Sequence, residues 1–240
     1  MIPEIRNSEG ERLDHTFHPG SDDCREILVI GHGVTGNKDR PALVALSEAL
    51  AAAGIPSLRI SFSGNGESEG SFEDSTISKE VADLGSVLDA LAGWRIGYVG
   101  HSMGGAVGVL RAAGDERIET LVSLAGMVDT AEFFERKFEE LTPGAGNMWD
   151  KPECPLSQTY ADDMRSVATV LPQAEQIEIP WLLVHGSADE VVLPKDSRLA
   201  QGATKGRADL VELEGVDHVF SDAGTASMTA CVVSWLQHNR

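Results

Sequence analysis

Apolar residues alternate along the chain between short continuous runs and segments with helical spacing. The runs that predict strands cover residues 26–30, 57–62, 95–99, 119–124, 181–185 and 209–213. Two sets of residues between the early strands have the three- and four-residue spacing of one helix face: Leu43, Leu46 and Leu50, then Val81, Leu84, Val87, Leu88 and Leu91. Apolar strands joined by amphipathic helices predict an α/β fold, with a mostly parallel sheet and helices on both faces.

Turn residues delimit these elements. Gly54 and Gly93 follow the two periodic segments, where a glycine cap would end a helix. Ahead of the first long strand, residues 2–6 and 13–17 flank the turn Asn7-Ser8-Glu9-Gly10 and predict a β-hairpin.

One long segment breaks the alternation. Residues 128–177 contain aromatic and acidic helical pieces around a Pro- and Gly-rich middle, and no predicted strand. A connection of this length is too long for an ordinary loop, so we expect a single domain with a helical cap or lid inserted at 128–177. Five cap aromatics either line an acyl pocket or only pack the cap onto the sheet: Phe133, Phe134, Phe138, Trp149 and Tyr160.

Charge and composition limit the kinds of molecule that we expect the protein to bind. The chain has 240 residues, 42% of them hydrophobic, and a formal net charge of −19. So acidic a surface repels nucleic acid and anionic lipid, and we attribute it to solubility in preference to a saline habitat. We expect a small-molecule ester as the partner, with no nucleic acid; a homodimer is left open.

The three cysteines, Cys24, Cys154 and Cys231, lack the spacing of a zinc or redox site, and we expect reduced, buried thiols. No His, Cys, Asp or Glu cluster has metal-ligand spacing, and no cofactor is implied. We also expect no signal peptide and no membrane span, since the start is not basic and no apolar run approaches roughly 20 residues. A cytoplasmic location is expected.

The residues Gly100-His101-Ser102-Met103-Gly104 connect the strand at 95–99 to a run of small, helix-compatible residues. By chance, Gly-x-Ser-x-Gly occurs in roughly one chain in six of this length, but the strand–turn–helix setting is that of a nucleophile elbow. The strained turn requires glycines on both sides of the serine. Ser102 is therefore the predicted nucleophile, at a helix N-terminus that favours negative charge.

A serine hydroxyl needs a base, and the base needs an acid to orient it. In this topology both follow the serine, on loops at the carboxyl ends of later strands. Among seven histidines, His218 lies in the loop directly after the last predicted strand and is the predicted base. Asp189 follows the strand at 181–185 and is the predicted acid.

Four other carboxylates compete with Asp189. Glu190 is the main rival as its direct neighbour, whereas Asp217 is adjacent to His218, and Asp196 and Asp209 fall on or before another element. Asp189 itself could instead be a turn residue that caps the next helix.

Acyl transfer also needs N–H donors for the oxyanion of the tetrahedral intermediate. We predict the backbone N–H groups of Met103, after the nucleophile, and of Val34, in the loop Gly31-His32-Gly33-Val34-Thr35-Gly36-Asn37. The alternative for that loop is a plain Gly-rich turn. A second Gly-rich run, at 63–70, lacks the spacing of a phosphate cradle and is interpreted as a turn.

With these residues in place, the chain from 27 to 235 resembles the α/β-hydrolase superfamily, and within it small bacterial carboxylesterases of the cinnamoyl/feruloyl esterase group. The segments at 32–37, 59–70, 185–189 and 217–220 carry the resemblance together with the elbow. Such relatives often have Asp at the position of Ser61 and His at that of Asn65, and this chain departs at both. The resemblance implies an α/β-hydrolase fold and hydrolysis of hydroxycinnamate or other small acyl esters.

The same triad also serves thioesterases, lipases and acyl-peptide hydrolases, which stay as alternatives. A non-catalytic binding module on a hydrolase fold is the alternative outside the enzymes.

Overall fold

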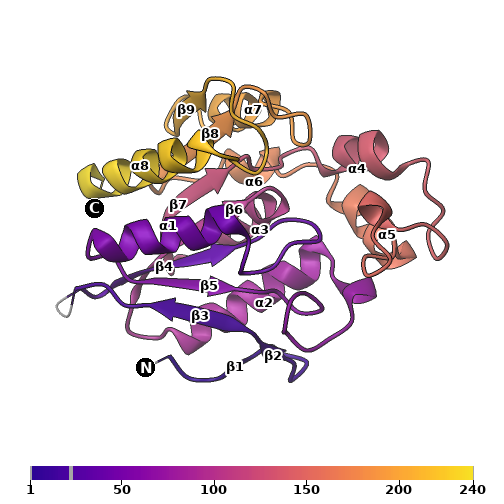
Figure 1. Ribbon diagram of the computed structural model, residues 1–240, viewed down its shortest axis with the longest axis horizontal. Coiled ribbons are helices and arrows are strands. Elements are labelled where there is room, and N and C mark those ends of the chain that lie inside the picture. Colours follow the sequence, from indigo (N-terminus) through magenta and orange to yellow (C-terminus); the bar gives the residue numbers. More distant parts are fainter. Residues whose placement is uncertain (1, 22–23, 240) are drawn as a thin grey trace.

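The computed structural model describes residues 2–21 and 24–239, and a seven-stranded sheet lies at its centre (Figure 1). The strands run across the sheet in the order β3 (His15–His18), β5 (Ser57–Ile60), β4 (Glu26–Gly31), β6 (Arg95–His101), β7 (Ile118–Leu124), β8 (Trp181–Gly186) and β9 (Asp209–Leu213). Strand β3 is antiparallel to β5, and all other neighbours in the sheet are parallel. The predicted α/β fold with a mostly parallel sheet is confirmed.

Helices cover both faces of the sheet because its strands are apolar on both sides. Along β4, Ile27 and Val29 are buried in one core, whereas Leu28 and Ile30 are buried in the other. The helices outside the cap are α1 (Pro41–Ala52), α2 (Ile77–Ala90), α3 (Met103–Ala112), α7 (Lys195–Ala203) and α8 (Ala223–His238). Helices α1 and α8 lie side by side on one face, and α2 and α3 pack together on the other (Figure 1).

The two glycines predicted to end helices do so. Gly54 follows the last turn of α1 with a left-handed φ of 78°, and Gly93 lies just beyond α2 with a φ of 93°. At the other end of α2, the Thr76 side chain accepts a hydrogen bond from the backbone N–H of Lys79 at 3.1 Å.

The predicted hairpin forms only in part. Strands β1 (Ile5–Arg6) and β2 (Arg12–Leu13) pair antiparallel as expected. The continuation to residue 17 is wrong, because β3 leaves the hairpin and pairs with β5 at the edge of the main sheet. Without β3, the edge of β5 would leave a row of backbone N–H and C=O groups unpaired. Pairing β3 there forms more backbone hydrogen bonds than the two-residue hairpin offers.

Residues 128–177 contain helices and, among the described residues, no strand beyond isolated bridges. The helical elements are α4 (Thr130–Phe138), η2 (Met148–Asp150), α5 (Gln158–Val167) and α6 (Leu171–Ala174); a further short turn, η1 (Phe72–Asp74), lies outside this segment. We call 128–177 the cap segment. Its helices α4 and α5 lie beyond the end toward which β4 and β6 point (Figure 1).

The three cysteines are free thiols. Cys154 is buried as predicted, but Cys24 and Cys231 are only half-buried. In the described part of the chain, no helix has both the length and the apolar character needed to cross a membrane.

A carboxyl group is enclosed beneath the loop that precedes α2. Glu80 is buried, and its Oε1 accepts a hydrogen bond from the Ser75 hydroxyl at 3.4 Å, whereas Oε2 has no partner among the described residues. Burial, and then the nearby charge of Asp83, raise the pKa of Glu80 well above its ordinary 4.5. The folded structure therefore favours the protonated form of Glu80.

We expect Glu80→Gln to stabilise the protein at about pH 8, with a gain that disappears below about pH 4.5. The unfolded chain ionises Glu80 at its ordinary pKa while the folded chain keeps the proton, so wild-type stability falls as pH rises between the two values. Each unit of difference corresponds to about 1.4 kcal/mol. Urea unfolding at several pH values measures this.

Glu67→Gln is the matched control, since Glu67 is exposed and the substitution changes the net charge equally. An equal loss of stability in Glu80→Gln at every pH would contradict a raised pKa of Glu80.

Candidate active site

Ser102 occupies a strained turn between β6 and α3. Its φ of 56° and ψ of −120° place it in a backbone conformation that non-glycine residues rarely adopt. The residue is 4% exposed and stands at the first turn of α3. Strand β6 runs two residues beyond its predicted end and leads directly into this turn. The predicted strand–turn–helix context of Ser102 is present.

The glycines on either side leave room for tight backbone contacts. A Cβ atom on Gly100 would lie 2.1 Å from the Gly104 carbonyl oxygen, and one on Gly104 would lie 2.5 Å from the His32 carbonyl oxygen. A side chain at Gly100 would therefore open the turn, and one at Gly104 would push away the loop after β4.

The three predicted chemical groups lie in a line of hydrogen bonds. His218 Nε2 is 3.1 Å from Ser102 Oγ, and His218 Nδ1 is 2.7 Å from Asp189 Oδ2. Because the carboxylate only accepts, Nδ1 carries the proton and Nε2 accepts the hydrogen bond of the serine hydroxyl. This is the tautomer in which His218 can remove the proton of Ser102.

Asp189 is held by more than His218. Its Oδ1 accepts the backbone N–H groups of Val191 at 2.8 Å and Val192 at 3.0 Å, and its Oδ2 is also 3.2 Å from His185 Nε2. Burial works to raise the pKa of Asp189, but the hydrogen bonds from His185 and His218 outweigh it, so the pKa lies well below its ordinary value. Asp189 therefore stabilises its turn with one oxygen and orients His218 with the other.

The rival carboxylates are engaged elsewhere. The competing side chains of Asp217, Asp196 and Asp209 accept hydrogen bonds from Ser221 N–H, Val128 N–H and the Trp235 indole, respectively. Glu190 is exposed, and only its backbone carbonyl is bonded, to Lys137 and Arg136 of α4. In the described structure, Asp189 is the carboxylate that contacts His218.

Two further histidines support the site without having been predicted to do so. Burial, and then the charge of His218, lower the pKa of His101 to about 3, so its ring is neutral and donates from Nε2 to the His218 carbonyl at 2.9 Å. His185 bonds Asp189 as described and Ser197 Oγ at 2.7 Å. The position of His101 beside the nucleophile and of His185 at the end of β8 was visible in the sequence, but their contacts depend on loop geometry.

The loop after β4 lies against the nucleophile. A Cβ on Gly33 would be 2.6 Å from Ser102 Cβ, and Val34 lines the same cavity as Ser102. His32 fixes this loop: its Nδ1 donates to the Gly33 carbonyl at 2.9 Å, and its Nε2 accepts from Phe62 N–H at 3.0 Å. That second bond draws Phe62 out of the strand predicted at 57–62, which ends at residue 60.

The two predicted oxyanion donors are the N–H groups of Met103, at the start of α3, and of Val34, in the loop after β4. Met103 is the first residue of α3, so its N–H has no acceptor within the helix. Among the described residues, neither Met103 N–H nor Val34 N–H donates to a protein acceptor. Both groups are therefore available to a ligand oxygen, as the oxyanion prediction requires.

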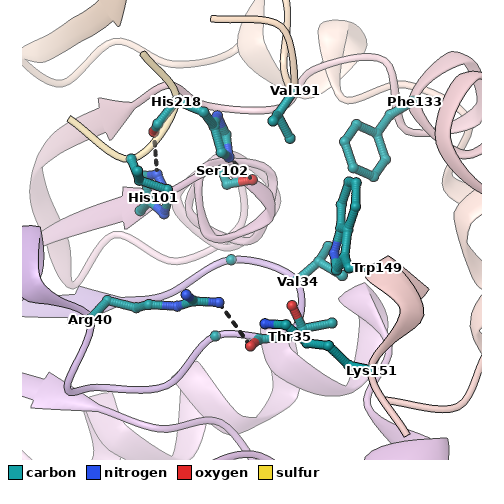
Figure 2. A pocket seen from close by; sticks show the side chains of 13 residues that line it. Val34, Thr35, Arg40, His101, Ser102, Phe133, Trp149, Lys151, Val191 and His218 are labelled. Atoms are coloured by element: carbon teal, nitrogen blue, oxygen red, sulfur yellow. Dashed lines mark hydrogen bonds between the residues drawn. The ribbon is translucent and has the colours of Figure 1, made fainter. Parts of the chain in front are cut away.

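A cavity of about 200 Å³ opens at Ser102 (Figure 2). Its lining combines the elbow, the loop after β4 and the cap segment: Gly33, Val34, Thr35, Gly36, Arg40, His101, Ser102, Phe133, Trp149, Lys151, Val191, His218 and Val219. Phe133 and Trp149 are the cap aromatics that line it, and Trp149 is 38% exposed. Phe134, Phe138 and Tyr160 are buried in the core, and so is Phe133, so each interpretation of the cap aromatics holds for part of the set.

The Gly-rich run at 63–70 forms turns, as interpreted from its spacing. Gly64, Gly66 and Gly70 all have positive φ, and Asn65 donates to the Ser63 carbonyl and the Ser75 hydroxyl. Within residues 2–21 and 24–239, no group of three or more His, Cys, Asp or Glu side chains could hold a metal ion.

Fold and site together define a hydrolase of the α/β type. The chain belongs to the alpha/beta hydrolase family, whose profile matches residues 27–226.

Comparison with known proteins gives relatives of two kinds. Mitochondrial palmitoyl-protein thioesterase ABHD10 of Bos taurus is 26% identical over 172 residues, 67% of this chain and 56% of that protein, so the match spans little more than half of the relative. The Mus musculus protein is 24% identical over 214 residues, covering 84% of this chain and 71% of its own length.

Among solved structures, Est1E from Butyrivibrio proteoclasticus with bound ferulic acid is similar, with a TM-score of 0.85, 24% identity and 99% coverage of both chains. Mouse ABHD10 has a TM-score of 0.80 at 19% identity, again with 99% coverage of both chains. At these identities the likeness concerns the fold.

We expect Asp189→Asn to lower kcat about 1,000- to 10,000-fold without unfolding the protein. With Oδ1 still facing the N–H groups of Val191 and Val192, the new amide would present its NH₂ to His218. His218 would then accept at Nδ1, carry its proton on Nε2, and have no lone pair for Ser102. Steady-state kinetics and thermal unfolding measure both effects.

Asp217→Asn is the control, because Asp217 adjoins His218 in sequence and its side chain accepts from the Ser221 N–H in this loop. Equal losses of activity in both variants would argue against a specific role for Asp189.

Proposed function

We propose that this hydrolase cleaves carboxylic esters through an acyl-enzyme intermediate on Ser102. The observation that carries the proposal is the bonded line from Ser102 through His218 to Asp189, at 3.1 and 2.7 Å, beside an open cavity. A serine hydroxyl has little nucleophilicity at neutral pH, and this line gives it a base of the correct tautomer.

In the first half-reaction, Ser102 Oγ attacks the ester carbonyl while His218 Nε2 takes the hydroxyl proton. The tetrahedral oxyanion then accepts hydrogen bonds from the N–H groups of Met103 and Val34, aided by the positive end of α3. Collapse expels the alkoxide, which receives the proton from His218 and leaves as the alcohol. The acyl group stays on Ser102.

In the second half-reaction, water attacks the acyl-enzyme and His218 again acts as the base. The collapsing intermediate releases the carboxylic acid, and Ser102 regains its proton. Asp189 remains a carboxylate throughout and stabilises the charged His218 ring, in keeping with the low pKa of Asp189.

Cavity size favours small acyl groups. About 200 Å³ lies below the roughly 300–1,000 Å³ of sites that take drug-sized ligands. Phe133 and Trp149 offer aromatic surface for a planar acyl group. Est1E, the structural neighbour with bound ferulic acid, makes hydroxycinnamate esters the first class to test.

Thioester hydrolysis is the second candidate. It is favoured by the ABHD10 relatives, which are palmitoyl-protein thioesterases. The acyl-enzyme route accepts a thiolate leaving group equally well. Rates on methyl ferulate, short and long p-nitrophenyl esters, acyl-CoA and aminoacyl substrates separate esterase, lipase, thioesterase and acyl-peptide hydrolase activities.

We expect Ser102→Ala to abolish turnover of p-nitrophenyl butyrate, with a fall in kcat on the order of a million-fold. The substitution removes the nucleophile and adds no volume, so the thermal unfolding temperature should change little. Release of p-nitrophenolate, followed by absorbance, measures turnover.

A fluorophosphonate probe supplies the comparison with a non-catalytic binding module. It should label the wild-type protein and not Ser102→Ala. Unlabelled wild-type protein, or wild-type turnover in Ser102→Ala, would overturn the proposal.

A further inference from the structure

Two cationic side chains line the cavity at Ser102. Arg40, just before α1, and Lys151, just after η2, are both half-buried and lie near Thr35 in the view of Figure 2. No carboxylate side chain belongs to the lining of this cavity. The cavity is therefore positively charged in a chain with 38 acidic and 19 basic residues.

Neither cation is neutralised by the protein in the part of the chain that the structure describes. Lys151 Nζ has no ion pair or hydrogen bond there, and the Arg40 guanidinium donates only to the Thr35 carbonyl, at 3.0 Å. Ten other Lys and Arg side chains in the described residues form ion pairs with carboxylates, for example Lys38 with Asp14 and Asp39. A partly desolvated cation without a counter-ion costs free energy, which an anionic ligand would offset.

The carboxylates closest in sequence do not serve as counter-ions. Asp39 adjoins Arg40 but is 2.8 Å from both Lys38 Nζ and Arg59 Nη1, so its charge is already compensated. Glu153 is exposed and lines only a neighbouring cavity. The spare guanidinium donors of Arg40 and the three ammonium donors of Lys151 therefore have no acidic acceptor within the Ser102 cavity.

The same two cations also line that second cavity, of about 510 Å³, which shares Thr35 and Gly36 with the first. Arg40 and Lys151 thus stand at the junction of the two cavities, the second of which is larger and also has the carboxylates of Asp39 and Glu153 in its lining. A substrate whose carbonyl is at Ser102 could place a distant charged group at this junction.

We propose that Arg40 and Lys151 form an anion-binding subsite, so that the preferred substrate carries a carboxylate or a phosphate away from the scissile carbonyl. The subsite rests on the proposed hydrolase function and specifies its substrate class. The charge can come from either side of the scissile bond, as a carboxylate on the acyl group or a phosphate on the leaving group. Guanidinium and ammonium groups bind both anions through charge-assisted hydrogen bonds.

Two matched substrate pairs distinguish these sources. Mono-p-nitrophenyl succinate against p-nitrophenyl butyrate tests a charge on the acyl group, and S-butyryl phosphopantetheine against S-butyryl pantetheine tests a charge on the leaving group. The wild-type protein should favour the charged member of at least one pair by about tenfold in kcat/KM. Added salt should reduce that ratio, because it screens the interaction.

Lys151→Gln should lower the charged-to-neutral ratio about fivefold or more, and Arg40→Gln should lower it as well. Lys205→Gln is the control of equal charge change, since Lys205 is exposed and outside both cavities, and it should leave the ratio unchanged. A general effect of Arg40→Gln on the Thr35 loop would change the rates on charged and neutral substrates alike, so it cancels in the charged-to-neutral ratio.

Hydrolysis of the neutral substrates with no preference for either charged one would overturn the subsite alone. Equal ratios in Lys151→Gln and Lys205→Gln would overturn it too. A folded wild-type protein that cleaves none of the four substrates would overturn the proposed hydrolysis and the subsite with it.

Discussion

The backbone of Ser102, with its φ of 56°, is the constraint on which the rest of the site depends. Such a conformation costs about 1–3 kcal/mol and persists only when neighbouring structure holds it. Here Ser102 N–H donates to the Leu124 carbonyl at 2.9 Å, and the Ser102 carbonyl accepts from Met127 N–H and Gly105 N–H, each at 2.9 Å. At about 1 kcal/mol each, these bonds offset the strain and fix the turn to the end of β7. The hydroxyl is thereby presented to His218 at the carboxyl edge of the sheet.

Much of this arrangement could be predicted from the sequence because it depends on order and periodicity. Apolar runs located the parallel strands, and the succession of strand ends selected Ser102, Asp189 and His218, which the structure brings together. The hairpin prediction is wrong beyond Leu13, because β3 pairs with the distant strand β5 and local alternation gives no information on such long-range pairing. The hydrogen bonds that support the triad could not be predicted either, because nothing in the neighbouring sequence indicates that His101 donates to the His218 carbonyl.

The cap segment and the charged side chains of the cavity determine the remaining features of the site. Within the cap segment, Phe134, Phe138 and Tyr160 belong to the core and Trp149 lines the cavity. Phe133 does both, because it is buried in the core and also forms part of the cavity lining. Arg136 and Lys137 of α4 donate to backbone carbonyls of Glu190 and Val191, which ties the cap to the turn that carries Asp189. The acidic surface and the cationic cavity are separate features, because net charge describes the average surface and not the lining beside Ser102.

The central claim is that Ser102 carries the acyl group during turnover. Intact-protein and peptide mass spectrometry after rapid acid quench of a reaction with p-nitrophenyl butyrate tests it directly. The expected result is one butyryl group per chain, located on the peptide that contains Ser102 and formed at the rate of the p-nitrophenolate burst. Turnover with no covalent adduct, or with the adduct on another residue, would contradict the claim.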